Sequence, residues 1–136
     1  MRKAGCDFNF FNFIILQVMP HYQKTGEAGE KMAVEYLSNC VFLILHQNWR
    51  LGYWEVDIIA SRYGTLHFFE VKTRRAIKLG YPEEDVTKKK VTNLIYASEE
   101  FLNLYPEWKR IQFDFLSVNL NKSEPPQFFF IEDVHK

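Results

Sequence analysis

The chain has 136 residues, 47% of them hydrophobic and 17% aromatic, which is enough for one domain with a sizeable core and excludes a largely disordered protein. Its 17 lysines and arginines balance 17 aspartates and glutamates, so the formal net charge at pH 7 is zero. A general attraction of the whole chain to nucleic acid or to an anionic membrane is therefore excluded. The charge is unevenly distributed, because the segment from Lys72 to Lys90 holds seven basic residues against three acidic ones.

The N-terminal segment, MRKAGCDFNFFNFIILQVMP, differs from the pattern that follows it. Its apolar part, Phe8 to Val18, is too short to span a bilayer, is interrupted by asparagine and glutamine, and lacks a small-residue cleavage site after it. We therefore predict an N-terminal extension over residues 1–20, with Met19 as an alternative start, and a domain over residues 21–136. A secretory signal, an extra strand and a packing arm are the alternatives.

The cysteines and histidines argue against a metal or disulfide scaffold. Cys6 and Cys40 match neither a zinc-ligand spacing nor a disulfide framework, and the four histidines are scattered along the chain. A reducing cytoplasm is therefore the expected compartment, with no membrane partner.

The first predicted element of the domain is a helix that begins at Thr25, a suitable N-cap. Glu27 and Glu30 fall in its first turns, where the helix dipole favours negative charge. Glu30 shares the helix face of Ala33 and Leu37, so it points the way the apolar face points. The continuous apolar run from Val41 to His46 then predicts a buried strand.

A hairpin, a second helix and two further strands complete the prediction. The strands Trp54–Ala60 and Leu66–Thr73 flank the turn SRYG, where Gly64 supplies conformational freedom. Apolar residues at helical spacing predict a helix over Thr87–Tyr105, before a proline. Strands over residues 110–120 and 127–134 are separated by the loop NKSEPP. The predicted order is α-β-β-β-α-β-β in one domain.

Charged side chains interrupt the apolar strands of the hairpin. Residues two apart in a strand share a face, which groups Glu55 with Asp57 and Glu70 with Lys72, and the hairpin lets the two pairs meet. Burying these carboxylates costs several kcal/mol per ion unless positive charge compensates. Mg²⁺ fits, because it takes one or two carboxylates together with waters and phosphate oxygens; Mn²⁺ is the alternative ion. The expected ligands are Asp57, Glu70 and the backbone carbonyl of Val71. Lys72 would orient or deprotonate the attacking water, or stabilise charge in the transition state.

The same residues have a plainer interpretation. A Glu-x-Lys step alone is usually a solvated strand face or a cross-strand ion pair. Asp57 on the neighbouring strand, the apolar flanks and the inward-facing Glu30 favour the catalytic interpretation, because independent cues agree. Glu55 is either a supporting residue of the site or a structural partner of Lys72 or Arg50.

Basic and aromatic residues near the hairpin offer contacts to nucleic acid. The candidates for contacts to backbone phosphates, which do not depend on sequence, are Arg74, Arg75, Lys88 and Lys90. The alternative is that these residues form a solvated surface. The candidates for stacking on unpaired bases are Trp49, Tyr53 and Trp54. The alternative is that these residues pack in the core or the hairpin.

Three sequence blocks, GEAGEKMAVEYL, NWRLGYWEVDIIA and FFEVKTR, resemble in the same order the signature blocks of the YraN-like family of small bacterial proteins. The resemblance extends from about Lys24 to the FDFLSV strand, and it places the chain in the PD-(D/E)xK, or restriction-endonuclease-like, nuclease superfamily. It implies an α/β domain with a central mixed β-sheet flanked by helices and an α-β-β-β-α-β core. It also implies a cation held by Asp57 and Glu70, with Lys72 as the catalytic lysine.

Further positions follow from the same resemblance. The chain is similar to archaeal Holliday junction resolvases in placing a glutamate on the first helix, which carries over to Glu30. Lys90 stands where the family tends to have a lysine on the second helix, and Asp114 matches a late strand, where a structural role is implied. Trp54 replaces the glycine that usually precedes the glutamate of the EVD block, and its bulk is expected to narrow access to the site.

These expectations combine into a metal-dependent endonuclease that hydrolyses phosphodiester bonds in branched or otherwise non-regular DNA. The absence of a base-reading motif argues against sequence specificity. Paired incisions in a four-way junction would favour a symmetric homodimer. The alternatives are a non-catalytic nucleic-acid-binding or scaffold module that keeps the nuclease fold, and a protein-interaction domain without affinity for nucleic acid.

Overall fold

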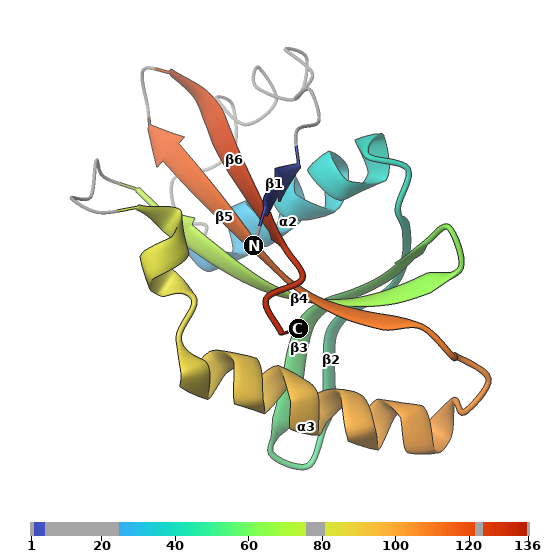
Figure 1. Cartoon of the computed structure of the whole chain (residues 1–136). Coiled ribbons are helices and arrows are strands. Elements are labelled where there is room, and N and C mark those ends of the chain that lie inside the picture. Colours follow the sequence, from blue (N-terminus) through green and yellow to red (C-terminus); the bar gives the residue numbers. More distant parts are fainter. Residues whose placement is uncertain (1, 5–24, 76–80, 122–123, 136) are drawn as a thin grey trace.

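The computed structural model describes residues 2–4, 25–75, 81–121 and 124–135 (Figure 1). The helices are α2 (Thr25–Asn39), the 3-10 helix η1 (Pro82–Asp85) and α3 (Lys88–Leu104). The strands are β1 (Arg2–Ala4), β2 (Leu43–Leu51), β3 (Trp54–Arg62), β4 (Thr65–Arg74), β5 (Ile111–Asn121) and β6 (Glu124–Glu132). The predicted order of two helices and five strands is confirmed, and β1 and η1 add to it.

The described strands form one mixed sheet in the order β1-β6-β5-β4-β3-β2. Only β4 and β5 pair in parallel, as they must, because the connection between them passes through α3. Helices α2 and α3 cover opposite faces of the sheet (Figure 1). The prediction of a single α/β domain with a restriction-endonuclease-like core is therefore confirmed.

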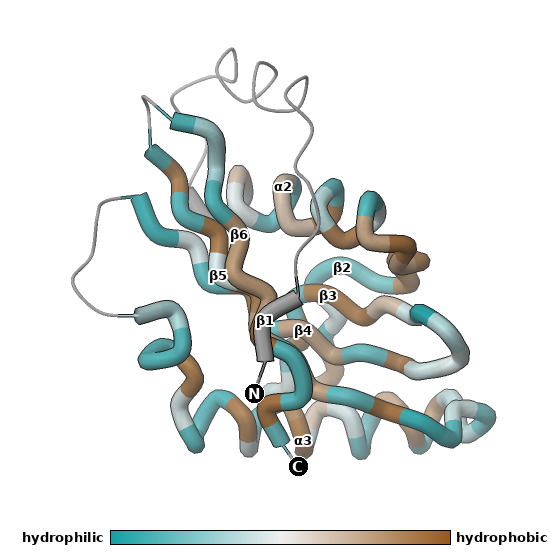
Figure 2. The backbone as a smooth tube through the Cα atoms, turned by 45° about the horizontal axis from the view of Figure 1, so that its top comes forward, coloured by the Kyte–Doolittle hydropathy of each residue, from teal (hydrophilic) through white to brown (hydrophobic). Residues whose placement is uncertain are grey.

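Each face of the sheet carries its own hydrophobic core. Tyr36 and Leu37 of α2 pack with Phe69 on one face, and Leu94 of α3 packs with Phe68 on the other. Successive residues of β4 thus point to opposite cores, as the strand geometry requires. Figure 2 shows hydrophobic residues along the middle of the central strands, with hydrophilic residues toward their ends. A charged side chain in the middle of β4 must therefore find a polar surrounding.

The start of α2 lies directly against β4. A Cβ atom built on Gly29 would lie 1.8 Å from the hydroxyl oxygen of Thr73 and 2.8 Å from its Cβ. Any side chain at position 29 would push the helix off the strand, because such separations are far below van der Waals contact. The next residue is Glu30, so this close approach sets how near its carboxylate lies to β4.

Helix α3 begins and ends where its sequence predicts. The Thr87 side chain caps it by accepting a hydrogen bond from the backbone N–H of Lys90 at 3.2 Å. The helix ends at Leu104, before Pro106. Its first turn contains lysines and no acidic residue, so positive side chains add to the positive end of the helix dipole.

The prediction of a buried strand over Val41–His46 is wrong in part. The strand begins at Leu43, continues to Leu51 and forms an edge of the sheet, paired only with β3. Val41 and Leu43 are exposed, whereas Phe42 between them is buried. A continuous apolar run cannot by itself distinguish a central strand from an edge strand with one covered face.

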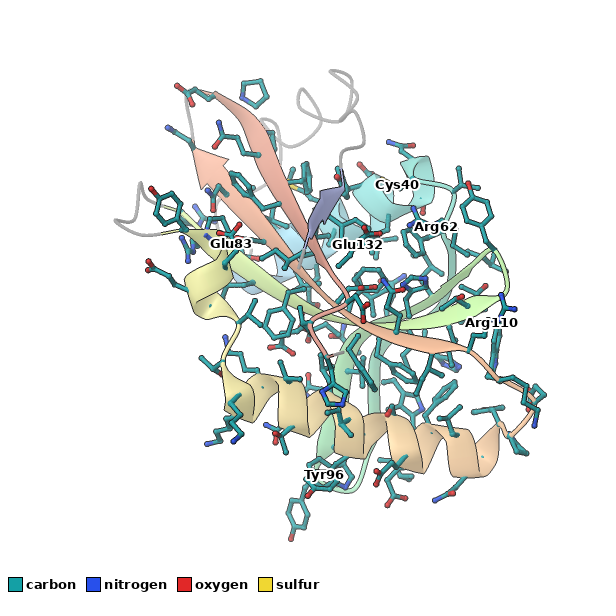
Figure 3. All side chains as sticks on the ribbon, in the orientation of Figure 1. Cys40, Arg62, Glu83, Tyr96, Arg110 and Glu132 are labelled. Carbon is teal, nitrogen blue, oxygen red and sulfur yellow. The ribbon has the colours of Figure 1, made fainter. Side chains whose placement is uncertain are left out.

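Arg62 ties the end of β3 to neighbouring elements, as its position beside Cys40 and Glu132 in Figure 3 shows. Its guanidinium donates to the Cys40 carbonyl at 3.2 Å and to Glu132 at 3.4 Å, and lies 4.1 Å from the centre of the Phe42 ring. Cys40 is buried and disulfide-bonded, which the sequence did not predict; Cys6 lies outside the described residues.

Part of the N-terminal segment belongs to the sheet. Residues Arg2–Ala4 form β1, which pairs antiparallel with β6. Met19 lies outside the described residues, so the alternative start and the division into residues 1–20 and 21–136 stay predictions. Neither of the long helices in the described part of the chain has the length and apolar character needed to cross a membrane.

Gly29→Ala is predicted to lower the free energy of unfolding by about 1–3 kcal/mol, because the added methyl group would overlap Thr73. Intrinsic helix propensity alone would predict the opposite sign, since alanine favours a helix over glycine by about 1 kcal/mol. Urea denaturation monitored by circular dichroism measures the change.

Two further variants separate this overlap from other effects of the substitution. Lys31→Ala, at an exposed position of the same helix, is expected to stay within about 0.5 kcal/mol of the wild type. In a Thr73→Ala background, Gly29→Ala should cost less, because part of the overlapping side chain is gone. Equal costs in both backgrounds would contradict the close-approach argument.

Candidate active site

Strands β3 and β4 separate at the predicted site. Their paired residues run from Arg62 with Thr65 to Ile58 with Phe69, and no further pair follows. Continued register would next pair Asp57 with Glu70, and then Val56 with Val71. Strand β4 instead stays paired with β5 as far as Arg74. One side of the site is therefore a continuous part of the sheet, and the other side is open.

The Asp57 carboxylate replaces the lost strand partner. Its Oδ2 accepts a hydrogen bond from the Val71 backbone N–H at 2.8 Å. A half-buried backbone donor is thereby satisfied, and the carboxylate is fixed against β4. Val71 was predicted to contribute its carbonyl to a cation; the structure places that residue in direct contact with the predicted Asp57 ligand.

A cleft of about 460 Å³ lies where the strands separate. It is bounded by the β2–β3 turn, by the diverging ends of β3 and β4, and by the N-terminal half of α3. The residues that line it are Tyr53, Trp54, Glu55, Asp57, Glu70, Lys90, Asn93 and Leu94. Three predicted carboxylates and one predicted lysine thus share a single opening.

The environment of Asp57 opposes its ionisation. Burial is the largest influence, and with the negative charge of Glu70 it raises the pKa of Asp57 from 3.8 to about 7. The hydrogen bond from Val71 lowers the pKa, and the charges of Glu30 and Glu55 raise it further. The charges of three other carboxylates, on α2, β3 and β4, therefore act on Asp57.

Glu70 shares this environment but has cationic neighbours. Burial is the largest influence and raises its pKa; Lys90 and then Lys72 act in the opposite direction. Glu55 and Glu30 contribute in the same direction as burial. The two lysines approach from different elements, one from α3 and one from β4 itself. The predicted constellation is thus assembled from four separate elements of secondary structure.

Glu55 has the structural partner that its sequence suggested as an alternative. It pairs with Arg50 across the β2–β3 hairpin at 3.3 Å, and both side chains are largely exposed. Such exposed pairs contribute little stability. Glu55 also lines the cleft, so both interpretations of this residue fit its position.

The four basic residues predicted to contact phosphates differ in their exposure and in their distance from the cleft. Lys90 lines the cleft, and Lys88 and Arg75 are exposed. Arg74 is buried, and its guanidinium bonds to Asp85 of η1 through both Nε and Nη2. This ion pair anchors η1 to β4. It also holds the Arg74 guanidinium in a buried position, away from the surface where the predicted contact to a backbone phosphate would be made.

The donor set of the cleft suits a hard divalent cation. Within the described ranges, no three or more histidine, cysteine, aspartate or glutamate side chains are close enough together to hold a metal ion by themselves. Mg²⁺ does not need such a cage, because it keeps several waters and takes one or two carboxylates. Asp57 and Glu70 meet that requirement, and their mutual repulsion would be relieved by a cation between them. Their roles stay predictions.

Asn93 and Leu94 line the cleft but were not singled out from the sequence. Their spacing from Lys90 was the available signal, since residues three and four apart lie on the same face of a helix. Once Lys90 is assigned to the cleft, this spacing predicts that Asn93 and Leu94 line it as well.

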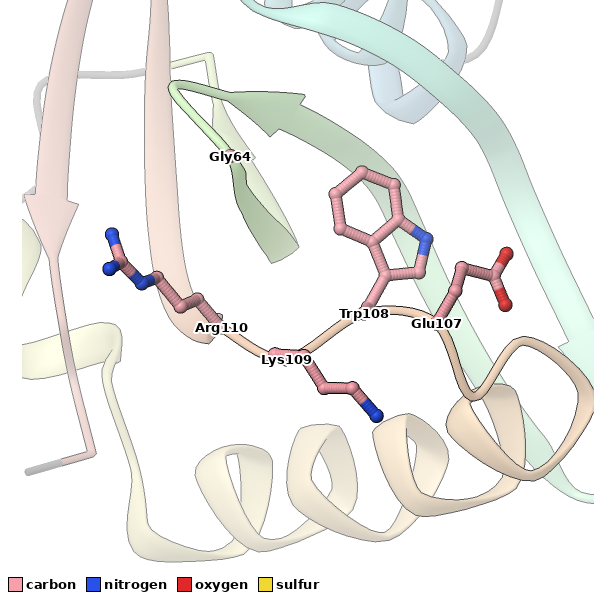
Figure 4. Close-up of a pocket in the computed structure, with 5 residues that line it drawn as sticks. All are labelled: Gly64, Glu107, Trp108, Lys109 and Arg110. Carbon is pink, nitrogen blue, oxygen red and sulfur yellow. The ribbon is translucent and has the colours of Figure 1, made fainter.

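Two other features lie away from the carboxylates. His67 Nδ1 and Asp114 Oδ2 form a buried contact of 2.6 Å, and Asp114 also accepts from Gln112 and from the Asp133 backbone N–H. These contacts agree with a structural role for Asp114. A second hollow, of about 410 Å³, lies at the turn end of β3 and β4 and is lined by Gly64 and residues 107–110 (Figure 4). Its lining contains one carboxylate only, so it lacks the paired acidic groups of the cleft.

Comparison with known proteins gives a family. The sequence model of the uncharacterised protein family UPF0102 matches residues 29–118. A UPF0102 protein of Bacteroides fragilis is 35% identical over 100 residues, which cover 74% of this chain and 83% of that protein. One of Dictyoglomus thermophilum is 37% identical over 74% of this chain and 86% of its own length. One of Caldicellulosiruptor saccharolyticus is 45% identical over 59% of this chain and 68% of its own length. The resemblance to the YraN-like family is thereby confirmed.

Asp57→Asn is predicted to stabilise the protein more at pH 8 than at pH 5. A folded-state pKa near 7, above the ordinary 3.8, means that the fold holds a proton that the unfolded chain releases. Wild-type stability therefore falls by up to about 1.4 kcal/mol for each pH unit between about pH 4 and pH 7, and the loss is complete above pH 7. Asparagine cannot ionise and can still accept from Val71.

Urea denaturation at pH 5 and pH 8 without divalent cations measures this difference. Glu99→Gln, at an exposed position of α3, makes the same chemical change outside the cleft and should show no such pH dependence. If Asp57→Asn changes the free energy of unfolding equally at both pH values, the pKa of Asp57 is not raised in the folded protein.

Proposed function

The chain belongs to the uncharacterised protein family UPF0102, and we propose that it is a metal-dependent nuclease that hydrolyses phosphodiester bonds in DNA. The observation that carries this proposal is that Asp57 and Glu70 line one cleft with Lys90, within reach of the charges of Glu30 and Lys72. A protein gains no stability from holding several carboxylates together in this way. Perturbed ionisable groups in a cleft are typical of catalytic sites.

Asp57, Glu70 and the Val71 carbonyl would hold a Mg²⁺ ion, or Mn²⁺ in its place. When bound, the cation would supply charge stabilisation at phosphate oxygens and make a nucleophile from water at neutral pH. It would also relieve the repulsion that raises the pKa of Asp57. Glu30, on α2, would add negative charge that strengthens the attraction for the cation.

The two lysines would act on the substrate directly. Lys72 lies next to Glu70 on the same face of β4, where its ammonium can orient the attacking water or stabilise the charge that develops on the phosphate. Lys90 lies at the N-terminal end of α3, where the helix dipole adds to its attraction for a phosphate. Both lysines already interact with Glu70, so substrate binding would be coupled to the carboxylate cluster.

The substrate class that we propose is branched or otherwise non-regular DNA. Lys88, Lys90 and Arg75 would contact backbone phosphates, which position a strand without reading its sequence. The zero net charge predicts that binding is weaker than for a protein with a uniformly basic surface. If four-way junctions are cut in pairs, a symmetric homodimer is the expected assembly.

Asp57→Asn, Glu70→Gln and Lys72→Met are each predicted to reduce cleavage by about 100-fold or more, because the first two remove negative charge that would hold the cation and the third removes positive charge that would stabilise the transition state. The measurement uses end-labelled four-way junction, flap, single-stranded and duplex DNA with Mg²⁺, Mn²⁺ or EDTA. Glu99→Gln and Lys109→Met make the same chemical changes at exposed positions outside the cleft and should retain full activity.

Binding of these DNAs without metal-dependent cleavage would contradict the nuclease proposal. The chain would then be a nucleic-acid-binding module that retains the fold. Cleavage that survives Asp57→Asn unchanged would instead place the catalytic centre elsewhere.

Mg²⁺ is also predicted to raise the melting temperature of the wild-type protein, because a ligand that binds only the folded state stabilises it. At about 100 times its dissociation constant, the cation would contribute about 2.7 kcal/mol. The rise should be lost in the double variant Asp57→Asn/Glu70→Gln and kept in Glu99→Gln. An equal rise in all three proteins would show that the cation binds outside the cleft.

A further inference from the structure

We propose that one wall of the cleft is a stacking site for an unpaired nucleobase, so that the substrate enters the active site as a single strand. This aromatic wall consists of Tyr53 and Trp54, and Tyr96 packs against Trp54. Tyr53 and Trp54 line the same cleft as Asp57 and Glu70. The inference deepens the proposed nuclease function by naming the form of the substrate.

Tyr53 is presented to solvent by the turn between β2 and β3. Leu51 pairs with Trp54, which leaves Gly52 and Tyr53 as a two-residue turn, and Gly52 adopts a positive φ of 60°. The Tyr53 side chain is fully exposed. An aromatic ring in that position contributes almost no core packing, although Tyr53 lines the cleft. Its surface is available to another flat molecule.

Trp54 and Tyr96 hold one another in place. Their ring centres are 5.4 Å apart with an angle of 36° between the planes. Trp54 is half-buried and packs against the core on the α3 side of the sheet, and Tyr96 lies on α3 beside the β2–β3 turn (Figure 3). About half of the Tyr96 side chain is exposed. The contact joins the start of β3 to α3, so the Trp54 ring is held in place beside the cleft.

Trp49 provides the contrast. Its ring packs against Phe101 with centres 5.3 Å apart, in the core between β2 and α3. Of the three aromatic residues whose sequence position suggested base stacking, Trp49 therefore has a core role. Tyr53 and Trp54 are the two that reach the cleft.

The remaining lining of the cleft favours a nucleotide over an apolar ligand. Glu55, Asp57 and Glu70 lie on one side, and Lys90 lies on the other. A purely apolar partner, such as a hydrophobic protein segment, would leave these charges buried without compensation. A nucleotide offers a flat base to the aromatic wall and a phosphate to Lys90 and to the cation that Asp57 and Glu70 would hold. Asn93 adds an amide that can donate to and accept from the edge of a base.

The size of the cleft suits a single nucleotide. About 460 Å³ is within the range of pockets that hold a single small ligand. A base in a duplex is stacked on its neighbours and would have to leave the helix to reach the wall, at a cost that is smallest in unpaired regions. Single strands, flaps and the open centres of junctions present such bases without that cost.

Binding of fluorescein-labelled DNA, measured by anisotropy in EDTA, tests the inference without cleavage. The probes are a 12-nucleotide single strand and the blunt duplex of the same sequence. Tyr53→Ala is expected to weaken binding of the single strand by about five-fold or more, the range found for loss of one stacked base, and to change duplex binding by less than about two-fold. Tyr53→Phe keeps the ring and should bind as the wild type does.

Tyr63→Ala is the matched control, because Tyr63 is an exposed tyrosine in the turn between β3 and β4, at the opposite end of their paired region. It should leave both affinities unchanged. Since Tyr53 is fully exposed, its alanine variant is expected to fold, which circular dichroism verifies. Trp54→Phe, which keeps an aromatic ring in the half-buried position, should retain most of the single-strand affinity.

The inference is overturned if Tyr53→Ala weakens single-strand and duplex binding equally, if it weakens neither, or if the wild type does not bind the single strand. These results are separable from those for cleavage. A Tyr53-dependent preference for single strands in a protein that never cuts DNA would reject the nuclease proposal and leave the stacking site intact. Metal-dependent cutting of duplex and single strand alike, unaffected by Tyr53→Ala, would support the nuclease proposal and reject the stacking site.

Discussion

The separation of β3 from β4 at Asp57 is the constraint on which the site depends. Had the two strands continued in register, Asp57 and Glu70 would be direct partners within the sheet, with the buried Val56 beside them. Their like charges would then lie directly opposite one another, which destabilises a sheet. By ending the pairing at Ile58, the chain opens a cleft there. The Asp57 side chain satisfies the Val71 N–H that the lost partner leaves behind, so the opening costs no unpaired donor at that position.

Two helices complete the site from opposite faces of the sheet. Helix α2 approaches β4 closely because Gly29 has no side chain to meet Thr73, and the following residue delivers Glu30. Helix α3 begins beside the cleft with its Thr87 cap, and its first turns deliver Lys90 and Asn93. Their positions depend on packing against the sheet, so the electrostatics of the cleft are fixed by the fold as a whole.

The sequence was sufficient to predict the elements and to group the charged residues, because both follow from the periodicity of strands and helices. It predicted that Glu70 and Lys72 share a face and that Glu30 points inward; in the structure the charges of Glu70 and Glu30 act on Asp57, and that of Lys72 acts on Glu70. Periodicity does not encode partners that are distant in the chain. The burial of Arg74 against Asp85, the disulfide bond of Cys40 and the edge position of β2 depend on tertiary contacts, so the pattern could not reveal them.

The charge balance of the cleft connects the two proposals. Three carboxylates and one lysine line the cleft, so at a pH at which the carboxylates are ionised an approaching phosphate meets a net negative field in the absence of a cation. Electrostatic attraction alone would therefore hold DNA poorly, and the zero net charge of the chain does not compensate. Stacking on the aromatic wall is independent of charge and acts on bases rather than phosphates. A site built in this way would gain its affinity for unpaired strands from its aromatic rings. Its carboxylates could then keep their full affinity for a cation, because binding of the DNA backbone would not require fewer negative charges in the cleft.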